Sequence, residues 1–434
     1  MRMIADSSPF VSDACFRPLL WLGQADAFLR RRLGVSLLRP DERELAALLD
    51  VPRVHPAFGD QAPVHQLLSA FLAGCRDRPR LSAMFFLGIK AWARSCLHAR
   101  RECMDYVARH PEVLEQPLAR PVVIMGMHRT GTTLLYNLLH QDERTRSPFL
   151  HEMYGPWSHL PPATSRAAQY SDRRMVLLKA HFDQGRRILP EGFAKRDRAH
   201  PTTHDMIEEE NVIGAHQMNW FMHIPLSDAR YQRLIFDPDK DFVFKYLRIY
   251  LQVLQTGYAP ASHWTLKSPS HLLHLDSFMR SFPDARVVLL HRDPKVTVPS
   301  LCYLIEALFG CYWLPESWDR RTLGPFVCEL YEAMTQRLMR HRDAHPETSR
   351  QFFDLEYAGL MADPVGTVQR IYQSFGIAYP ASLEDRLKDY LAQQPQHKHG
   401  KPDYTLEKYG VTAQQIDQRF AEYRDRYLSL PGGV

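Results

Sequence analysis

The stretch PVVIMGMHRTGTTLLYNLL, residues 121–139, constrains the fold of this chain more than any other. Its four consecutive apolar residues at 122–125 predict a short buried strand. A turn with glycines at both ends follows at 126–131, and the leucines at 134–139 predict a helix with one apolar face. A strand, a glycine turn and a helix in succession are typical of an α/β sheet whose turn binds an anion.

The turn matches a nucleotide-binding P-loop at all but one of its defining positions. The P-loop pattern G-x-x-x-x-G-K-[ST] has a lysine after the second glycine. Gly126 and Gly131 keep the spacing and Thr133 occupies the Ser/Thr position, but Thr132 replaces the lysine. Because that lysine reaches the β- and γ-phosphates, its absence argues against a kinase or nucleoside triphosphatase, which stays as the alternative.

Arg129 supplies a positive charge in place of the missing lysine. It lies two residues before Gly131 and can form a forked hydrogen bond to two oxygens of one anion. Thr130, Thr132 and Thr133 add hydroxyl donors to the backbone N–H groups of the helix start. We expect this loop to bind a phosphate-like anion; the alternative is a plain strand–helix turn with a surface arginine.

Composition narrows the class of protein. The chain has 434 residues, of which 45% are hydrophobic and 24% charged, as in an ordinary globular protein. The net charge of +5 permits an anionic ligand but does not suggest a nucleic-acid partner. The seven cysteines are scattered without a C-x-x-C pair, which favours reduced core thiols over disulfides or a zinc site. No secretory signal or bilayer-length apolar run is apparent, so we expect a cytoplasmic protein.

Short apolar runs alternate with helical segments after residue 121, which predicts a parallel sheet flanked by helices. The fold class is therefore α/β, with a P-loop-like sheet, a helical N-terminal extension over 1–118 and a domain over 119–434 that contains a helical insertion at about 165–257. The candidate strands are 122–125, 263–266, 286–291 and 351–355, and the candidate helices are 132–140, 270–281, 295–308, 365–375 and 412–428.

Two motifs in this order resemble PAPS-dependent sulfotransferases. R-T-G-T-T at 129–133 is similar to the family's loop for the 5′-phosphosulfate, although His128 stands where proline is usual. ARVVLLHRDPKVTVPS is similar to its 3′-phosphate site, in which an arginine ends a buried strand and a serine follows eight positions later, here Arg292 and Ser300. The resemblance covers about 121–428 and is nearest to the bacterial branch, with a distant similarity to protein-tyrosine sulfotransferases.

The resemblance implies an activity and its donor. The enzyme would move a sulfuryl group from 3′-phosphoadenylyl sulfate (PAPS) to a hydroxyl or amine of a small acceptor, with no metal. A PAPS-binding protein without catalytic activity is a second alternative. The residues implied in binding PAPS are His128, Arg129, Thr130, Gly131, Thr132, Thr133, Arg292, Ser300, Lys398 and Tyr404.

The catalytic groups follow from position along the chain. Glu152, 23 residues after Arg129, lies just past the first strand–helix unit, near the sheet edge where α/β proteins bind ligands, and is our expected base. His151 is its alternative. Lys267 in WTLKSPSH follows a predicted strand and, with Arg129, is expected to stabilise the leaving group.

Other segments allow two interpretations each. Glu208 and Glu209 belong either to a solvated helix start or to a wall of the acceptor pocket. The basic amphipathic segment 17–38 either packs as a helix or contacts a membrane surface peripherally. Aromatic and apolar residues of the insertion suit a partly apolar acceptor, such as a lipid, and suit a helical core equally well. The oligomeric state stays open.

Overall fold

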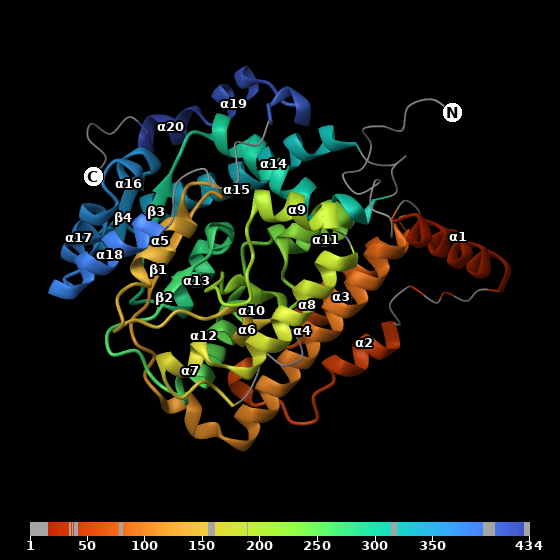
Figure 1. Cartoon of the computed structure of the whole chain (residues 1–434), viewed down its shortest axis with the longest axis horizontal. Coiled ribbons are helices and arrows are strands. Elements are labelled where there is room, and N and C mark those ends of the chain that lie inside the picture. The colour runs from red at the N-terminus through yellow and green to blue at the C-terminus, as the bar shows by residue number, and fades with distance from the viewer. Residues whose placement is uncertain are drawn as a thin grey trace.

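The computed structural model contains a parallel sheet of four strands, which lies on the left in Figure 1. The order is β2-β1-β3-β4, and every neighbouring pair is parallel. The strands are β1 (Val122–Gly126), β2 (Thr265–Lys267), β3 (Arg286–His291) and β4 (Phe352–Glu356). The structure describes residues 16–33, 36, 38, 42–77, 81–154, 161–188, 190–313, 319–393 and 404–428.

The sheet is buried on both faces, as parallel sheets usually are. Alternate residues of β1 belong to two different hydrophobic clusters: Val122 and Ile124 to one, Val123 and Met125 to the other. The first cluster includes α5 (Thr132–Leu139), α17 (Pro364–Ser374) and α18 (Ala381–Gln393). The second includes α13 (Leu275–Ser281), α14 (Pro294–Phe309) and α15 (Leu323–Ala344).

Strand register brings the carboxyl ends of the sheet to one edge. Gly126, the last residue of β1, pairs with Leu290 of β3, while Ile124 pairs with Lys267 at the end of β2. His291 of β3 pairs with Glu356 of β4. The loops that follow β1, β2 and β3 therefore leave the sheet at the same edge, which is where open α/β sheets bind their ligands.

A helical insertion connects β1 to β2. It packs between the sheet and the N-terminal helices and contributes the long buried helix α12 (Asp241–Gln255). Its other members are α6 (Leu150–Met153), α7 (Arg166–Tyr170), α8 (Arg173–Ile188), α9 (Pro190–Ala199), α10 (Asn211–Ala215), the 3-10 helix η3 (Phe221–Leu226) and α11 (Ala229–Phe236).

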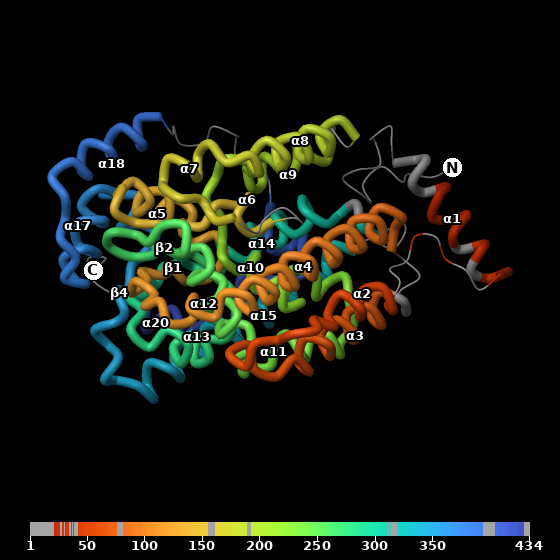
Figure 2. The backbone as a smooth tube through the Cα atoms, turned by 90° about the horizontal axis from the view of Figure 1, so that it is seen from below, coloured from red at the N-terminus to blue at the C-terminus, as the bar shows by residue number. Residues whose placement is uncertain are grey.

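The N-terminal helices share the hydrophobic core of the insertion. Phe71 of α3 (Ala62–Asp77) packs on Tyr231 of α11 with ring centroids 5.2 Å apart. The 27-residue α4 (Ala83–Arg109) runs along the same body, while α1 (Phe16–Leu33) extends to the end away from the sheet (Figure 2). α2 (Glu42–Leu49) packs against α4. None of the described helices combines the length and the apolar character needed to cross a bilayer.

The expected α/β class is confirmed, and the differences are local. The strand predicted at 263–266 begins two residues later, at Thr265, because His263 and Trp264 belong to the approach to the strand. The helix predicted at 270–281 is a 3-10 helix, η4 (Pro269–His274), that leads into α13. The last predicted helix is two, α19 (Ala413–Arg419) and α20 (Ala421–Tyr427), and α16 (Tyr357–Ala362) was not predicted.

Candidate active site

The loop after β1 adopts a conformation that depends on its glycines. Gly131 has a φ of 93°, and a Cβ there would lie 2.9 Å from the ring of Tyr357. A Cβ on Gly126 would lie 2.5 Å from the carbonyl oxygen of Leu290. Arg129 itself has a left-handed φ of 72°, which non-glycine residues rarely adopt. The glycines therefore allow the loop to pack tightly against Tyr357 and β3.

Side chains from inside and outside the loop hold this conformation. The Thr130 hydroxyl donates to the carbonyl of Met127 at 2.8 Å. Tyr331 of α15 donates its hydroxyl to the carbonyl of His128, also at 2.8 Å. The helix α5 then begins at Thr132, so the N–H groups of its first turn adjoin the loop. Such N–H groups attract an anion.

Arg129, Arg292 and Ser300 meet although they lie on different elements. Arg129 Nε donates to Ser300 Oγ of α14 at 3.1 Å, and Arg292 Nη1 donates to the backbone carbonyl of Arg129 at 2.9 Å. The guanidinium of Arg292 stacks on Tyr357, 3.8 Å from the ring centroid. Burial lowers the pKa of Arg129, and Arg292 acts in the same direction. Two close guanidinium groups suit a polyanionic ligand.

Lys267 ends β2 in a cluster of carboxylates. Its Nζ lies 2.7 Å from Glu209 Oε1 and 3.4 Å from Glu208 Oε1, while its side chain is 1% exposed. Glu210 accepts from the backbone N–H of Lys267 at 2.8 Å and pairs with His271 Nε2 at 2.9 Å. Both oxygens of Glu210 are thus used. Glu209 accepts from Lys267 at Oε1 and from Asn211 Nδ2 at Oε2, at 2.9 Å, and its side chain is 19% exposed.

The environment separates the pKa values of the two glutamates. The pKa of Glu209 is raised. Burial and the charge of Glu208 raise it, and they outweigh Lys267, which lowers it. Burial also acts to raise the pKa of Glu208, but Lys267 and His200 outweigh it and the net pKa is lowered. Burial acts to lower the pKa of Lys267, and its two carboxylate partners reverse this. Such divergence between neighbouring acids is typical of acid–base sites.

His128 projects from the loop with both ring nitrogens buried and without a hydrogen-bond partner among the described residues. Its ring lies 4.8 Å from that of Phe221. Burial, followed by the charges of Lys267 and Arg129, lowers the pKa of His128 to about 3. The imidazole is therefore neutral near pH 7 and keeps one donor and one acceptor for a ligand.

Glu152, the predicted base, accepts hydrogen bonds at both of its carboxylate oxygens. It is fully buried, and Arg146 Nη2 donates to its Oε1 at 3.1 Å. Gln169 Nε2 and the backbone N–H of Phe149 donate to Oε2 at 2.7 and 3.0 Å. Both oxygens of Glu152 thus help to hold α6 and α7, and its role as the base stays a prediction. His151, the alternative, is also fully buried, 3.8 Å from Asp172.

Of the two C-terminal residues predicted to bind the donor, Lys398 and Tyr404, the structure describes one. Lys398 lies outside the described residues. The structure does describe Tyr404, whose ring centroid is 5.8 Å from that of Tyr303 on α14. Burial lowers the pKa of Arg129, and Tyr404 acts to raise it. Tyr331 and Tyr357, which the sequence motifs do not include, also border the loop. In the sequence, Tyr331 is only an aromatic residue inside a long helix, and Tyr357 is only an aromatic residue directly after β4.

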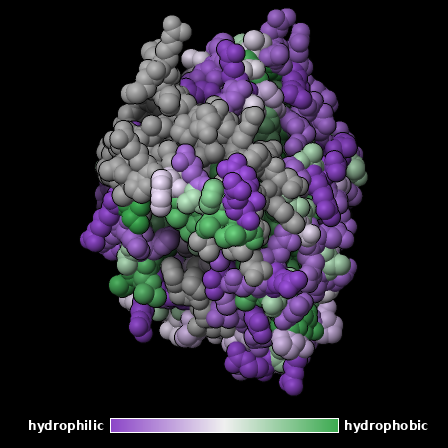
Figure 3. All heavy atoms as spheres, turned by 90° about the vertical axis from the view of Figure 1, so that its right-hand side faces the viewer, coloured by the Kyte–Doolittle hydropathy of each residue, from purple (hydrophilic) through white to green (hydrophobic). Residues whose placement is uncertain are grey.

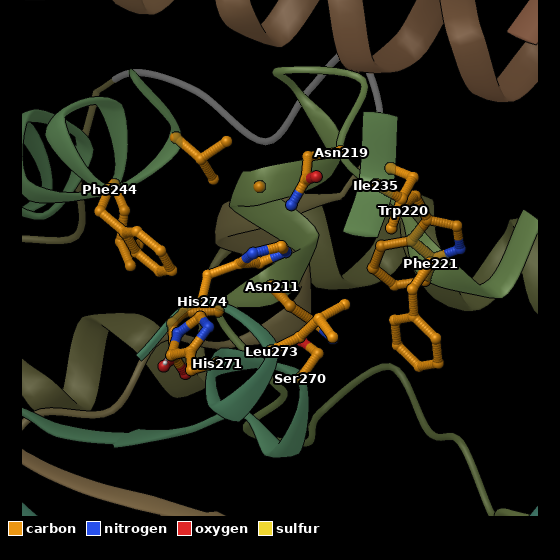
Figure 4. Close-up of a pocket in the computed structure, with 14 residues that line it drawn as sticks. Asn211, Asn219, Trp220, Phe221, Ile235, Phe244, Ser270, His271, Leu273 and His274 are labelled. Carbon is orange, nitrogen blue, oxygen red and sulfur yellow. Dashed lines mark hydrogen bonds and ion pairs between the residues drawn. The ribbon is translucent and has the colours of Figure 1, made fainter. Parts of the chain in front are cut away.

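A narrow cavity adjoins the carboxylate cluster (Figure 4). Its volume is about 20 Å³, which suffices for one water. Figure 4 shows Phe221 and Trp220 on one side and Phe244 on the other, with His271 and His274 below. The lining residues are Glu210, Asn211, Gly214, Asn219, Trp220, Phe221, Ile235, Val243, Phe244, Leu247, Ser270, His271, Leu273 and His274.

Known proteins share this architecture. The chain is 28% identical to the crystallised sulfotransferase STF9 of Mycobacterium avium, with a TM-score of 0.76 over 90% of this chain and 97% of that one. The fold is also that of STF1 of Mycobacterium tuberculosis, with a TM-score of 0.72, 23% identity, and coverage of 89% and 99%.

Sequence comparison agrees. The omega-hydroxy-beta-dihydromenaquinone-9 sulfotransferases Stf3 of Mycobacterium bovis and Mycobacterium tuberculosis are 26% identical over 309 residues, which are 71% of this chain and 74% of theirs. The sequence model of the sulfotransferase family matches residues 121–381, more than half of the chain. The chain therefore belongs to the sulfotransferase family and is an enzyme of sulfuryl transfer.

Proposed function

We propose that the sulfuryl donor is PAPS and that it lies across the carboxyl edge of β1 and β3. One observation carries this proposal: Arg129 contacts Ser300, and Arg292 contacts the backbone of Arg129, so two separate anion motifs form one surface. A nucleotide with phosphates at both ends of its ribose is the ligand class that such a divided cationic site suits.

Each phosphate has its own set of donors in this arrangement. The loop amides of residues 130–133 and the Arg129 guanidinium bind the 5′-phosphosulfate, with His128 beside it. Arg292 and Ser300 bind the 3′-phosphate. Tyr404 contributes from the C-terminal segment, and Lys398 is proposed for the same segment from the sequence alone. The stack of Arg292 on Tyr357 presets the guanidinium.

Transfer then needs a base and charge stabilisation. The acceptor oxygen or nitrogen attacks sulfur as the bond from sulfur to the bridging phosphate oxygen breaks. The acceptor proton passes to Glu209, which we propose as the base beside the predicted Glu152 because its pKa is raised and its side chain is partly exposed. Protonation of Glu209 weakens its ion pair with Lys267, which leaves that ammonium, with Arg129, to stabilise the departing phosphate.

We propose a hydroxyl on a partly apolar molecule as the acceptor. Phe221 contacts His128, and with Trp220 it also lines the cavity beside Glu210. The relatives from Mycobacterium are omega-hydroxy-beta-dihydromenaquinone-9 sulfotransferases, and the acceptor in that name is a hydroxylated molecule. A screen of hydroxylated lipids, aromatic alcohols and sugars with labelled PAPS tests this; transfer to sugars alone would contradict it.

We further propose a cytoplasmic enzyme whose α1 contacts a membrane surface. Trp21, Phe28 and Leu33 are exposed by 70, 57 and 69%, which is unusual for large apolar side chains. Arg31 and Arg32 are exposed on the same helix, so the surface pairs apolar with cationic groups, as interfacial helices do. Figure 3 views the molecule from the side toward which α1 extends and shows apolar patches among hydrophilic surface.

Calorimetry without magnesium tests the donor. We expect adenosine 3′,5′-bisphosphate to bind more tightly than ATP, and Arg292→Ala and Ser300→Ala each to weaken the bisphosphate and to leave ATP little changed. Preference for ATP, or no effect of either substitution, would favour the kinase alternative. Binding without transfer to any acceptor would favour an inactive PAPS-binding protein.

A further inference from the structure

Two histidines and an aspartate converge on the side of the molecule where α13 meets α15 (Figure 2). His341 lies on α15, His345 caps its C-terminus one turn later, and Asp276 lies on α13. One ligand atom from each of the three residues falls within 4.8 Å of the other two. His341 Nδ1 is 2.5 Å from Asp276 Oδ1, and the two imidazole centroids are 4.8 Å apart.

We propose that Asp276, His341 and His345 bind a divalent transition-metal ion of the zinc class. Two imidazoles and one carboxylate form a donor set typical of Zn²⁺, with water completing the coordination. Histidines at positions i and i+4 of a helix point to one side, which is a common way to hold such an ion.

The spacing allows the geometry that the ion requires. Ligands about 2.0–2.2 Å from a tetrahedral ion lie about 3.4 Å from one another, between the shortest and longest separations in this cluster. The side chains of Asp276 and His345 are 59 and 47% exposed and can adjust by small rotations, whereas His341 is 4% exposed and fixed. The site is thus anchored on one buried ligand.

A supporting carboxylate is also present. Glu347 Oε1 lies 3.2 Å from His345 Nδ1. Around bound metals, a carboxylate commonly accepts from the ring nitrogen that does not ligate the ion and so orients the imidazole. This interaction leaves Nε2 of His345 as the ligating atom.

The position in the fold indicates a structural role. α13 leads into the start of β3, and α15 leads through the 3-10 helix η8 (Pro346–Gln351) into the start of β4. An ion shared by these helices ties together the segments that enter two neighbouring strands. The residues proposed for sulfuryl transfer lie at the opposite, carboxyl edge, so the ion takes no part in that reaction, and the inference does not depend on the identity of the donor.

His110 provides a matched control within the same chain. Like His345, it caps a long helix, with φ and ψ of −132° and 62° against −130° and 59°. Each histidine is followed by a proline and then a glutamate whose carboxylate lies 3.2 Å from Nδ1. The residue four positions before His110 is Tyr106 instead of a histidine, and no metal-binding group that includes His110 is found among the described residues.

The experiment uses untagged full-length protein stripped with chelator and dialysed. Zn²⁺ is titrated by calorimetry, and Co²⁺ is added to report tetrahedral coordination by its visible absorption. We expect one tight Zn²⁺ site in the wild type and in His110→Ala. Bound Zn²⁺ should raise the melting temperature of both proteins by a few degrees. His345→Ala and Asp276→Asn should each weaken that site by at least about tenfold, since each removes a ligand.

These two substitutions change exposed side chains, so the folded variants can be compared directly. Absence of a saturable site in the wild type would overturn the proposal. Equal Zn²⁺ affinity in His345→Ala and His110→Ala would overturn it as well, because the ion would then be held elsewhere.

Discussion

The ammonium of Lys267 lies 2.7 Å from the carboxylate of Glu209, and this ion pair joins the end of β2 to the helical insertion at the edge where the β1 loop opens. It links the group proposed to take the acceptor proton with the group proposed to meet the leaving phosphate. The buried pair of Arg146 and Glu152 is a separate ion pair without solvent access. The two pairs therefore predict different results of mutation.

Glu209→Gln should lower kcat by about 10²- to 10⁴-fold, the usual contribution of a general base. Because burial raises the pKa of Glu209, the rate of the wild type should rise with pH through an apparent pKa above 4.5, and this rise should disappear in the variant. The measurement is a pH profile of kcat/KM with an acceptor found in the screen. Glu208→Gln is the control; an equal loss there would assign the base role differently.

Glu152→Gln should act on stability more than on the reaction. Removing one member of a buried ion pair typically costs about 3–5 kcal/mol, because Arg146 would keep its charge without a carboxylate. Urea unfolding measures this cost. The folded fraction of the variant should keep kcat within a few-fold of wild type. A folded, stable but inactive variant would assign the base role to Glu152.

His128→Pro places the residue usual in the family in the loop. Two hydrogen bonds hold the loop, from Thr130 to the carbonyl of Met127 and from Tyr331 to the carbonyl of His128, and neither uses the His128 ring. The affinity for adenosine 3′,5′-bisphosphate should therefore change by less than threefold. The KM for the acceptor should rise, because the two unpartnered ring nitrogens are lost. Steady-state kinetics with varied acceptor and with varied donor separate the two effects. A donor KM that rises instead would place His128 against the nucleotide.

Buried neutral histidines should make stability depend on pH. Burial lowers the pKa of His223 and His128 to about 3, and burial likewise lowers that of His216 and His263 to about 4, from 6.5. The unfolded chain therefore binds more protons below pH 6.5. The stability that these groups contribute is complete above that pH and is lost as pH falls toward 3–4, by up to about 1.4 kcal/mol per pH unit for each histidine.

His223→Phe isolates one of these histidines. Its ring stacks on Phe71 at 5.3 Å and meets Trp92 edge-on at 4.4 Å, so phenylalanine suits the site. The fall in unfolding free energy between pH 6.5 and 5 should become shallower in the variant than in wild type. An unchanged slope would show that His223 is solvated in the folded protein.

α1 should bind the protein to anionic vesicles. Trp21→Glu together with Phe28→Glu should abolish co-sedimentation with vesicles that contain acidic lipid, whereas Leu87→Glu, at a 41% exposed leucine on α4, should not. Binding to neutral vesicles should be weaker, because Arg31 and Arg32 then lack partners. Equal loss in the α4 variant would refute a specific role for α1.

Local physics made much of this molecule predictable from its sequence. A run of apolar residues, a glycine turn and a helix start predict β1, the anion loop and α5, because the φ angles of the turn and the first hydrogen bonds of the helix depend mainly on residues close together in the sequence. The eight-residue spacing from Arg292 to Ser300 belongs to one strand-to-helix turn and is equally local. These features identified the α/β class and Arg129, and the resemblance to sulfotransferases added Arg292 and Ser300.

Tertiary packing decided the rest. Glu152 and Glu209 are both carboxylates near the same sheet edge, and their sequence contexts do not separate them. Glu152 packs beside the buried Arg146, while Glu209 folds over Lys267 from 58 residues away. Asp276 and His341, 65 residues apart, meet because α13 packs against α15. Solvation and charge pairing depend on such distant neighbours, so the roles of these ionisable groups are set by the folded arrangement and not by local sequence.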